Sequence, residues 1–270
     1  DVEEGAGGDA GPTPALEGVT LEARRGELHV VVGPVAAGKS TLLLSLLGEC
    51  PQVAPEAAAS MATAGPTAIG GGCGIRGLAS YCPQEAWVVS GSLRQNVLLS
   101  RGTAAEGDGW EGERNSREGA AGEAAPWLEA RFRAAVDTTG LAQDAAAFED
   151  GYDTMLGAQG KRASGGQKAR VNLARAVLDP RTEAVLLDDP LSAVDARTGR
   201  RIMERCVQGL LLRRGPFADA CKDAHDAADA LGVTAPPAVV LATHQLQWLP
   251  LADRVTVLMR GTVRASGTPA

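Results

Sequence analysis

The feature that most constrains this chain is the run GPVAAGKS from Gly33 to Ser40, which fits the pattern G-x-x-x-x-G-K-[ST]. The apolar stretch from Leu28 to Val32 comes directly before it and predicts a buried strand, and the leucine-rich stretch from Lys39 to Leu47 predicts a helix after it. Backbone N–H groups in such a loop point at phosphate oxygens. The lysine neutralises phosphate charge, and the serine hydroxyl completes a Mg²⁺ shell. The flanking elements favour this phosphate site over a glycine-rich turn with a chance lysine.

Two carboxylates follow a second apolar stretch. Residues Ala184 to Leu187 predict a buried strand that leads into Asp188 and Asp189. P-loop enzymes hold Mg²⁺ with a carboxylate at the end of such a strand, which makes Asp188 the candidate metal ligand. Asp189 could accept a proton from an attacking water. An aspartate after a strand is common at turns, so this pattern alone is a weak signal. Together with the phosphate loop it becomes a strong indication of a metal site.

A third pattern is the run Ser164-Gly165-Gly166-Gln167, followed by apolar residues at helical spacing up to Leu178. Ser164 is a plausible N-cap, and the two glycines allow the backbone to approach a phosphate closely. From these residues alone, an ordinary capped helix is an equally good interpretation.

The remaining apolar stretches complete an α/β pattern. Val239 to Ala242 predicts a third buried strand, and Val255 to Leu258 with Thr262 to Val263 predicts a closing hairpin. Alternating strands and helices indicate a single α/β domain, 1–270, around a largely parallel sheet. The segments 54–77, 102–126 and 213–236 are predicted to be mobile surface insertions, because none has a pattern that would bury a face. Within the last one, Ala218 to Leu231 could form a weak helix.

Composition excludes several classes of protein. The net charge of −7 and the pI near 5.1 argue against a nucleic-acid partner. The five cysteines are scattered and never in CxxC or CxxH spacing, so neither a metal site nor a disulfide framework is expected. No stretch approaches the ~18 consecutive apolar residues that a membrane helix needs.

The order of the motifs resembles that of ABC transporter nucleotide-binding domains, because Ser164–Gln167 would be the family signature between the phosphate loop and Leu186–Asp189. The stretches 81–87, 191–195 and 243–247 resemble the Q-loop, D-loop and His-switch of that family. The residues of these motifs are similar to those in the first of two such domains in subfamily C, the multidrug-resistance-associated exporters. The resemblance runs from about Leu16 to about Gly267 and implies a piece excised from a longer protein. It also implies a P-loop NTPase core, an antiparallel β-subdomain, and a helical subdomain at about 90–180 that carries the signature.

The resemblance further implies ATP and Mg²⁺ as cofactors, sandwiched between two such domains. The Mg²⁺ ligands would be Ser40, Gln84 and Asp188, and the catalytic residues Asp189, His244 and Gln84. The ATP on this domain would contact Gly33, Pro34, Val35, Ala36, Ala37, Gly38, Lys39, Ser40 and Thr41. The partner's ATP would contact Ser164, Gly165, Gly166 and Gln167.

The implied partners are a second nucleotide-binding domain in the same polypeptide and the transmembrane domains of a transporter, at the cytoplasmic face of a membrane. Gln84 to Val97 would form the groove that receives a short helix of the transmembrane part, so exposed apolar side chains such as Trp87 are expected there. The resemblance leaves two alternatives: a soluble non-transport ABC ATPase, and a regulatory nucleotide-binding module with almost no turnover. A P-loop kinase is disfavoured, because kinases have no Ser-Gly-Gly-Gln helix.

Several positions depart from the family pattern. Asp189 stands where an efficient site has glutamate, which predicts slow hydrolysis. Ala36 stands where the subfamily usually has glycine, and costs about 1 kcal/mol if that position needs a positive φ. Ala163 replaces the usual signature leucine. No aromatic residue precedes Tyr81, so we expect the chain to hold phosphates better than it holds a base.

Overall fold

The computed structural model describes residues 14–50, 74–75, 77–99, 126–157 and 163–269. The predicted insertions at 54–77 and 102–126 therefore lie almost entirely outside the described residues. The elements in chain order are β1 (Leu28–Val32), α1 (Lys39–Leu46), β2 (Ala79–Cys82), α2 (Leu93–Leu98), α3 (Pro126–Thr138), α4 (Leu141–Ala146), the short 3-10 helix η2 (Gly151–Asp153), α5 (Gly165–Ala176), β3 (Ala184–Asp188), α6 (Ala196–Ile202) with its π-helical continuation η4 (Met203–Leu211), η5 (Asp219–Cys221), α7 (Lys222–Asp229), β4 (Ala238–Thr243), η6 (Leu246–Leu251), β5 (Arg254–Met259) and β6 (Thr262–Gly267).

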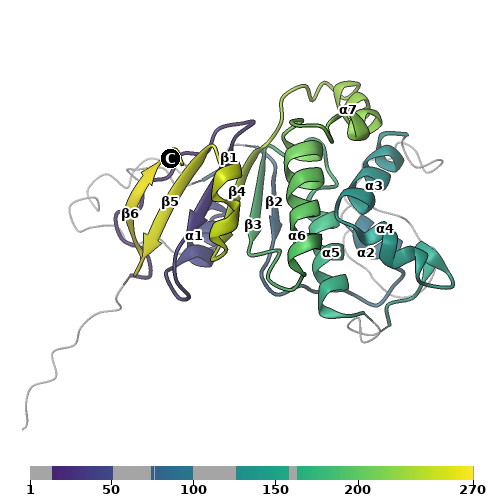
Figure 1. Ribbon diagram of the computed structural model, residues 1–270, viewed down its shortest axis with the longest axis horizontal. Helices are drawn as coiled ribbons and strands as arrows, with labels where there is room; N and C mark the ends of the chain where they lie inside the picture. Colours follow the sequence, from purple (N-terminus) through teal and green to yellow (C-terminus); the bar gives the residue numbers. More distant parts are fainter. Residues whose placement is uncertain (1–13, 51–73, 76, 100–125, 158–162, 270) are drawn as a thin grey trace, which may run out of the picture.

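The strands form one six-stranded sheet in the order β2-β3-β4-β1-β5-β6 (Figure 1). All neighbouring pairs are parallel except β5 and β6, which form the predicted closing hairpin. The prediction of an α/β fold with a mostly parallel sheet is confirmed. Because parallel strands end at the same edge, the loop after β1, Asp188 at the end of β3 and Thr243 at the end of β4 meet there.

Alternate residues of the central strands point to opposite faces of the sheet. Val31, Leu186 and Val240 lie on the face covered by α1, where they pack against Leu42 and Leu43. Leu42 and Leu43 belong to the leucine stripe that predicted this helix, and they are its buried residues.

The other face of the sheet carries the larger core. Val30, Val185 and Val239 belong to it, together with Phe132 of α3 and Leu173 of α5. Figure 1 shows α3, α4, α5 and α6 gathered beside the β2 and β3 edge, with α1 near the centre of the sheet. No helix in the described ranges combines the length and the apolar character that crossing a membrane requires.

The helix expected within Ala218 to Leu231 is present, but the segment 213–236 around it differs from the mobile surface insertion that its composition predicted. It contains η5 and α7, and α7 packs against α3. Cys221, Ala224, His225 and Ala228 are buried at helical spacing. The expectation that no face of this segment would be buried was wrong because the stripe is built mostly from small residues, which add little to the hydrophobic pattern although they fit closely against another helix.

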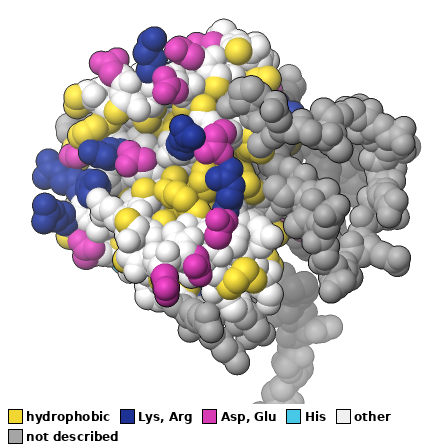
Figure 2. Space-filling model, turned by 90° about the vertical axis from the view of Figure 1, so that its right-hand side faces the viewer, with side chains coloured by type: hydrophobic (Ala, Val, Ile, Leu, Met, Phe, Trp, Pro, Cys, Tyr) yellow, Lys and Arg dark blue, Asp and Glu magenta, His cyan; other side chains and the backbone are white. Residues whose placement is uncertain are grey.

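The helical end of the molecule has charged side chains around a hydrophobic centre (Figure 2). At this end, α3 and α7 border a groove of about 390 Å³. Ala130, Arg133, Ala134, Asp223 and Ala224 are among the residues that line it.

Candidate functional site

The loop between β1 and α1 has a backbone that restricts its residues. A side chain at Gly33 would collide with the carbonyl oxygen of Leu258 on the neighbouring strand, so only glycine fits. Gly38 caps α1 with φ = 98°, in the left-handed region. Ala36 has φ = 61°, so the backbone strain expected of a residue with a side chain at a positive φ is present.

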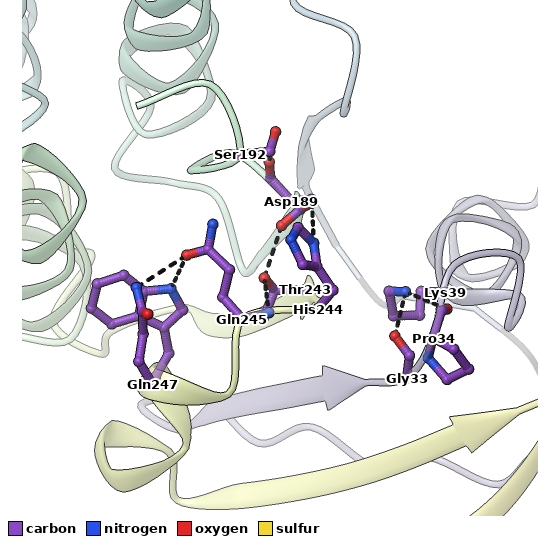
Figure 3. A network of polar contacts seen from close by, with 10 residues as sticks. Gly33, Pro34, Lys39, Asp189, Ser192, Thr243, His244, Gln245 and Gln247 are labelled. Atoms are coloured by element: carbon purple, nitrogen blue, oxygen red, sulfur yellow. Dashed lines mark hydrogen bonds and ion pairs between the residues drawn. The ribbon is translucent and has the colours of Figure 1, made fainter. Parts of the chain in front are cut away.

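Lys39 is held inside this loop. Its Nζ atom donates hydrogen bonds to the carbonyl oxygens of Gly33 at 2.8 Å and Pro34 at 2.9 Å (Figure 3). Phosphate oxygens are stronger acceptors because they carry charge. An anion bound over the loop would therefore replace these two carbonyls as partners of the ammonium group.

Asp188 is the candidate metal ligand, and the structure brings it together with Ser40. Its side chain is buried at the end of β3, where burial raises the pKa of the Asp188 carboxyl, and the charge of Asp189 acts in the same direction. Hydrogen bonds from Ser40 and Tyr81 oppose the rise in pKa. A buried carboxylate beside a hydroxyl is the hard oxygen donor set that Mg²⁺ prefers, and a cation would offset the cost of burying this charge. The residues present therefore fit the ion.

Tyr81 is a further residue of the site, and it was not among the predicted site residues. Its hydroxyl donates to Oδ2 of Asp188 at 3.2 Å. The contact arises because β2 lies parallel to β3 with Tyr81 opposite Leu186, two residues before Asp188. Only the pairing of these two strands reveals it, since the residues are far apart in sequence.

Asp189 makes two hydrogen bonds within this chain. Its Oδ1 accepts from the Thr243 hydroxyl at 2.8 Å, and its Oδ2 lies 2.8 Å from Nδ1 of His244 (Figure 3). The Asp189 side chain is 8% exposed, whereas that of His244 is 54% exposed. Both carboxylate oxygens are therefore engaged at the base of the site, while the imidazole ring extends from it.

The signature run Ser164–Gln167 starts α5 with a capping box. The Gln167 backbone N–H donates to Ser164 Oγ at 3.2 Å, and the Ser164 N–H donates to Gln167 Oε1 at 2.8 Å. Gly166 lies against the loop after β3, because a Cβ there would approach the Ala193 carbonyl oxygen to 3.2 Å. In the described part of the chain, no hydrogen bond joins this run to Lys39 or Asp188. The capped helix is therefore confirmed.

Gln84 lies on the exposed loop after β2, and no hydrogen bond among the described residues joins its side chain to Ser40 or Asp188. Downstream of it, Trp87 is 47% exposed. The guanidinium carbon of Arg175 lies over its ring, 3.9 Å from the ring centre. Val89 and Leu99 are also exposed. The expected exposed apolar side chains are therefore present in this region.

Comparison with known proteins gives the same family as the motifs. The ABC transporter family matches residues 16–192. ATP-binding cassette sub-family C member 4 of Homo sapiens is 35% identical over 259 residues, which are 96% of this chain and 15% of that protein. The Mus musculus protein of the same name is 34% identical over 95% of the chain and 14% of its own length. ABC transporter C family member 9 of Arabidopsis thaliana is 32% identical over 94% of the chain and 13% of its own length.

The chain thus spans about one seventh of the length of these relatives. The match includes the strand that ends at Asp188, the phosphate loop and the signature helix. The chain belongs to the ABC transporter family, of which it is an ATPase domain similar to those of subfamily C.

Proposed function

We propose that this chain binds Mg-ATP at the edge of its sheet, pairs with a second nucleotide-binding domain and drives export by a membrane transporter. The observation that carries the proposal is the meeting of Lys39, Ser40 and Asp188 at one edge of a parallel sheet. The transported substrate would contact parts of the protein outside this chain, so it has no part in the argument.

Each residue at this edge has a distinct part in the proposal. Lys39 and the N–H groups of residues 33–41 hold the β and γ phosphates. Ser40 and Asp188, with Gln84 closing in from the loop after β2, hold Mg²⁺. When bound, this ion neutralises charge on the phosphates. His244 contacts the γ phosphate through Nε2, because Asp189 engages Nδ1.

We assign slow turnover to this site. A general base must reach the attacking water, and general-base help is worth ~10²–10⁴-fold in rate. Both oxygens of Asp189 are engaged by Thr243 and His244, and the side chain is one methylene shorter than glutamate. The same observation supports a regulatory role, in which this site retains ATP while the paired site hydrolyses it.

The proposed second domain would cover the nucleotide edge. Val35 of the phosphate loop is 89% exposed and Leu246, just after His244, is 63% exposed. Apolar side chains exposed on neighbouring loops suit a protein partner better than water. Ser164 to Gln167 make no hydrogen bond to Lys39 or Asp188 among the described residues, and they are assigned to the partner's ATP. Trp87, Val89 and Leu99 are assigned to the contact with the transmembrane domains at the cytoplasmic face.

The test uses the full-length transporter in lipid vesicles. Ser164→Arg should abolish most ATP hydrolysis while leaving labelled ATP bound at this chain's own phosphate loop, because the serine serves the partner's nucleotide. Ala230→Arg is the matched control, since it adds the same side chain at an exposed position on the far end of α7. Unchanged hydrolysis in the Ser164→Arg transporter would contradict the paired arrangement, and loss of ATP from this chain's site would place the signature on the wrong nucleotide.

A further inference from the structure

The hydroxyl group of Tyr81 lies at the nucleotide edge without a part in the proposed binding of Mg-ATP. It donates a hydrogen bond to Oδ2 of Asp188 at 3.2 Å. A tyrosine hydroxyl keeps its proton at neutral pH, so toward a carboxylate it acts as a donor. The hydroxyl therefore supports the carboxylate that is assigned to Mg²⁺.

The ring of Tyr81 is held between the two elements that carry the metal-ligand candidates. It packs against the core cluster that contains Leu42 and Leu43 of α1. Its strand, β2, pairs in parallel with β3. Because α1 carries Ser40 in its first turn and β3 ends at Asp188, the hydroxyl is presented from a position fixed against both.

The carboxylate of Asp188 needs outside support to keep one orientation. The last torsion of an aspartate side chain has a broad, roughly two-fold profile, so its own rotamer does not fix the carboxylate. Among the described residues, hydroxyl groups of Ser40 and Tyr81 donate to it. Ser40 is itself a candidate ligand of the ion, so Tyr81 is the donor that can orient the carboxylate from outside the metal site.

A donor of this kind has two opposing effects on metal binding. It withdraws electron density from the oxygen, which weakens the carboxylate as a ligand. It also fixes the orientation of the ligand, and removing such a partner typically lowers metal affinity about 10–100-fold. The burial of Asp188 favours the second effect, because a buried oxygen that loses its donor has no bulk water to replace it.

We propose that Tyr81 is a positioning residue of the metal site, whose hydroxyl holds the carboxylate of Asp188 in the orientation that binds Mg²⁺ beside Ser40. Tyr81 contacts neither the ion nor the nucleotide and acts only through Asp188. The inference rests on the Mg-ATP site of the proposed function and adds to it a residue on which the affinity for the ion depends.

The experiment measures ATP binding to the 270-residue chain by isothermal titration calorimetry, once in excess Mg²⁺ and once in EDTA. The dissociation constant in EDTA divided by that in Mg²⁺ gives the contribution of the ion. Complex formation between Mg²⁺ and free ATP is the same for every variant, so it cancels when these ratios are compared. Tyr81→Phe keeps the ring and removes the hydroxyl, so the ratio should fall about 10-fold while the dissociation constant in EDTA stays as in wild type.

Two further comparisons show whether the hydroxyl acts through Asp188. Tyr152→Phe is the matched control, because it removes the hydroxyl of the other tyrosine of the chain, whose ring packs against Phe132, and it should leave the ratio unchanged. Asp188→Asn should itself lower the ratio, and adding Tyr81→Phe to it should lower the ratio little further. Two effects that simply add would overturn the inference, since Tyr81 would then act independently of Asp188.

The remaining outcomes separate this inference from the proposed function. An unchanged or higher ratio in Tyr81→Phe would overturn the inference and leave the metal site in place. Equal losses of affinity in Mg²⁺ and in EDTA would overturn it as well, because Tyr81 would then support the nucleotide site as a whole. If wild type bound ATP equally well in both solutions, the proposed metal site would fail, and the inference with it, before any variant was compared.

Discussion

Oδ2 of Asp189 and Nδ1 of His244 lie 2.8 Å apart, at the point where the loop after β3 meets the end of β4. Asp189 has φ = 44°, and its N–H donates to the carbonyl oxygen of Ala242 at 2.8 Å, so the backbone itself directs the carboxylate toward β4. The shared hydrogen bond leaves Nε2 as the imidazole nitrogen that faces outward. In this arrangement each oxygen of Asp189 already has one hydrogen-bond partner within the chain.

The first prediction concerns this carboxylate. In the full-length transporter, Asp189→Glu should raise hydrolysis at this site by ~10-fold or more, because a longer side chain can reach a water beyond the Thr243 and His244 contacts. Asp189→Asn should change the total ATPase rate little. Single-turnover hydrolysis of ATP trapped at this site is the measurement, and Asp223→Glu on the exposed face of α7 is the matched control. If Asp189→Asn removed most of the total activity, this site would be the active one and the assignment of slow turnover would be wrong.

The second prediction concerns binding at the phosphate loop. Lys39→Ala should weaken Mg-ATP binding by about 2 kcal/mol, the contribution of a charge-assisted hydrogen bond. The loss is limited because Lys39 gives up two carbonyl partners, those of Gly33 and Pro34, when it turns to phosphate. Isothermal titration calorimetry gives the difference, with Lys222→Ala as the control for removing one positive charge. Equal affinities in wild type and Lys39→Ala would show that the phosphates bind elsewhere.

Much of the fold was predictable because its signals are local. The apolar run Leu28–Val32 is β1 without adjustment, and the helix predicted from Lys39 ends one residue earlier than expected. Ser164 was predicted as an N-cap, and it forms the cap with Gln167. Caps, glycines and short β-branched runs act within a few residues, so they can be identified without knowing the tertiary structure.

The parts that were not predictable depend on contacts between distant segments. The hydrogen bond from Tyr81 to Asp188 needs β2 beside β3, and the engagement of Asp189 by Thr243 needs β4 beside β3. The role of Gln84 at Mg²⁺ remains a prediction, because no hydrogen bond among the described residues joins its side chain to Ser40 or Asp188.

The third prediction follows from the burial of Asp188. Burial raises the pKa of this carboxyl in the folded protein, so the ionised form destabilises the nucleotide-free fold. The cost is absent when the carboxyl is protonated in both states, and it appears as pH rises through the unfolded and then the folded pKa. Asp188→Asn should therefore raise the free energy of unfolding near neutral pH, with a smaller gain in acid. Urea unfolding at several pH values measures this.

The same unfolding measurement with Mg-ATP added separates the structural effect of Asp188 from its proposed role as a metal ligand. Adding Mg-ATP should stabilise the wild type more than it stabilises Asp188→Asn, because the amide is a poorer ligand for a hard cation. A variant that is less stable than wild type at neutral pH would contradict the burial argument. Equal stabilisation of both proteins by Mg-ATP would contradict the metal assignment.

The last prediction concerns strain in the phosphate loop. Ala36 has φ = 61°, a region that costs a residue with a side chain about 1–2 kcal/mol, whereas glycine enters it freely. Ala36→Gly should therefore raise the free energy of unfolding by about 1 kcal/mol. Ala37→Gly is the matched control, because Ala37 is buried with a negative φ and should lose about 0.5–1 kcal/mol when its side chain is removed. Urea unfolding of the nucleotide-free chain distinguishes the two, since opposite signs are expected at adjacent positions. Destabilisation by both substitutions would mean that the loop adopts another conformation at Ala36 in solution.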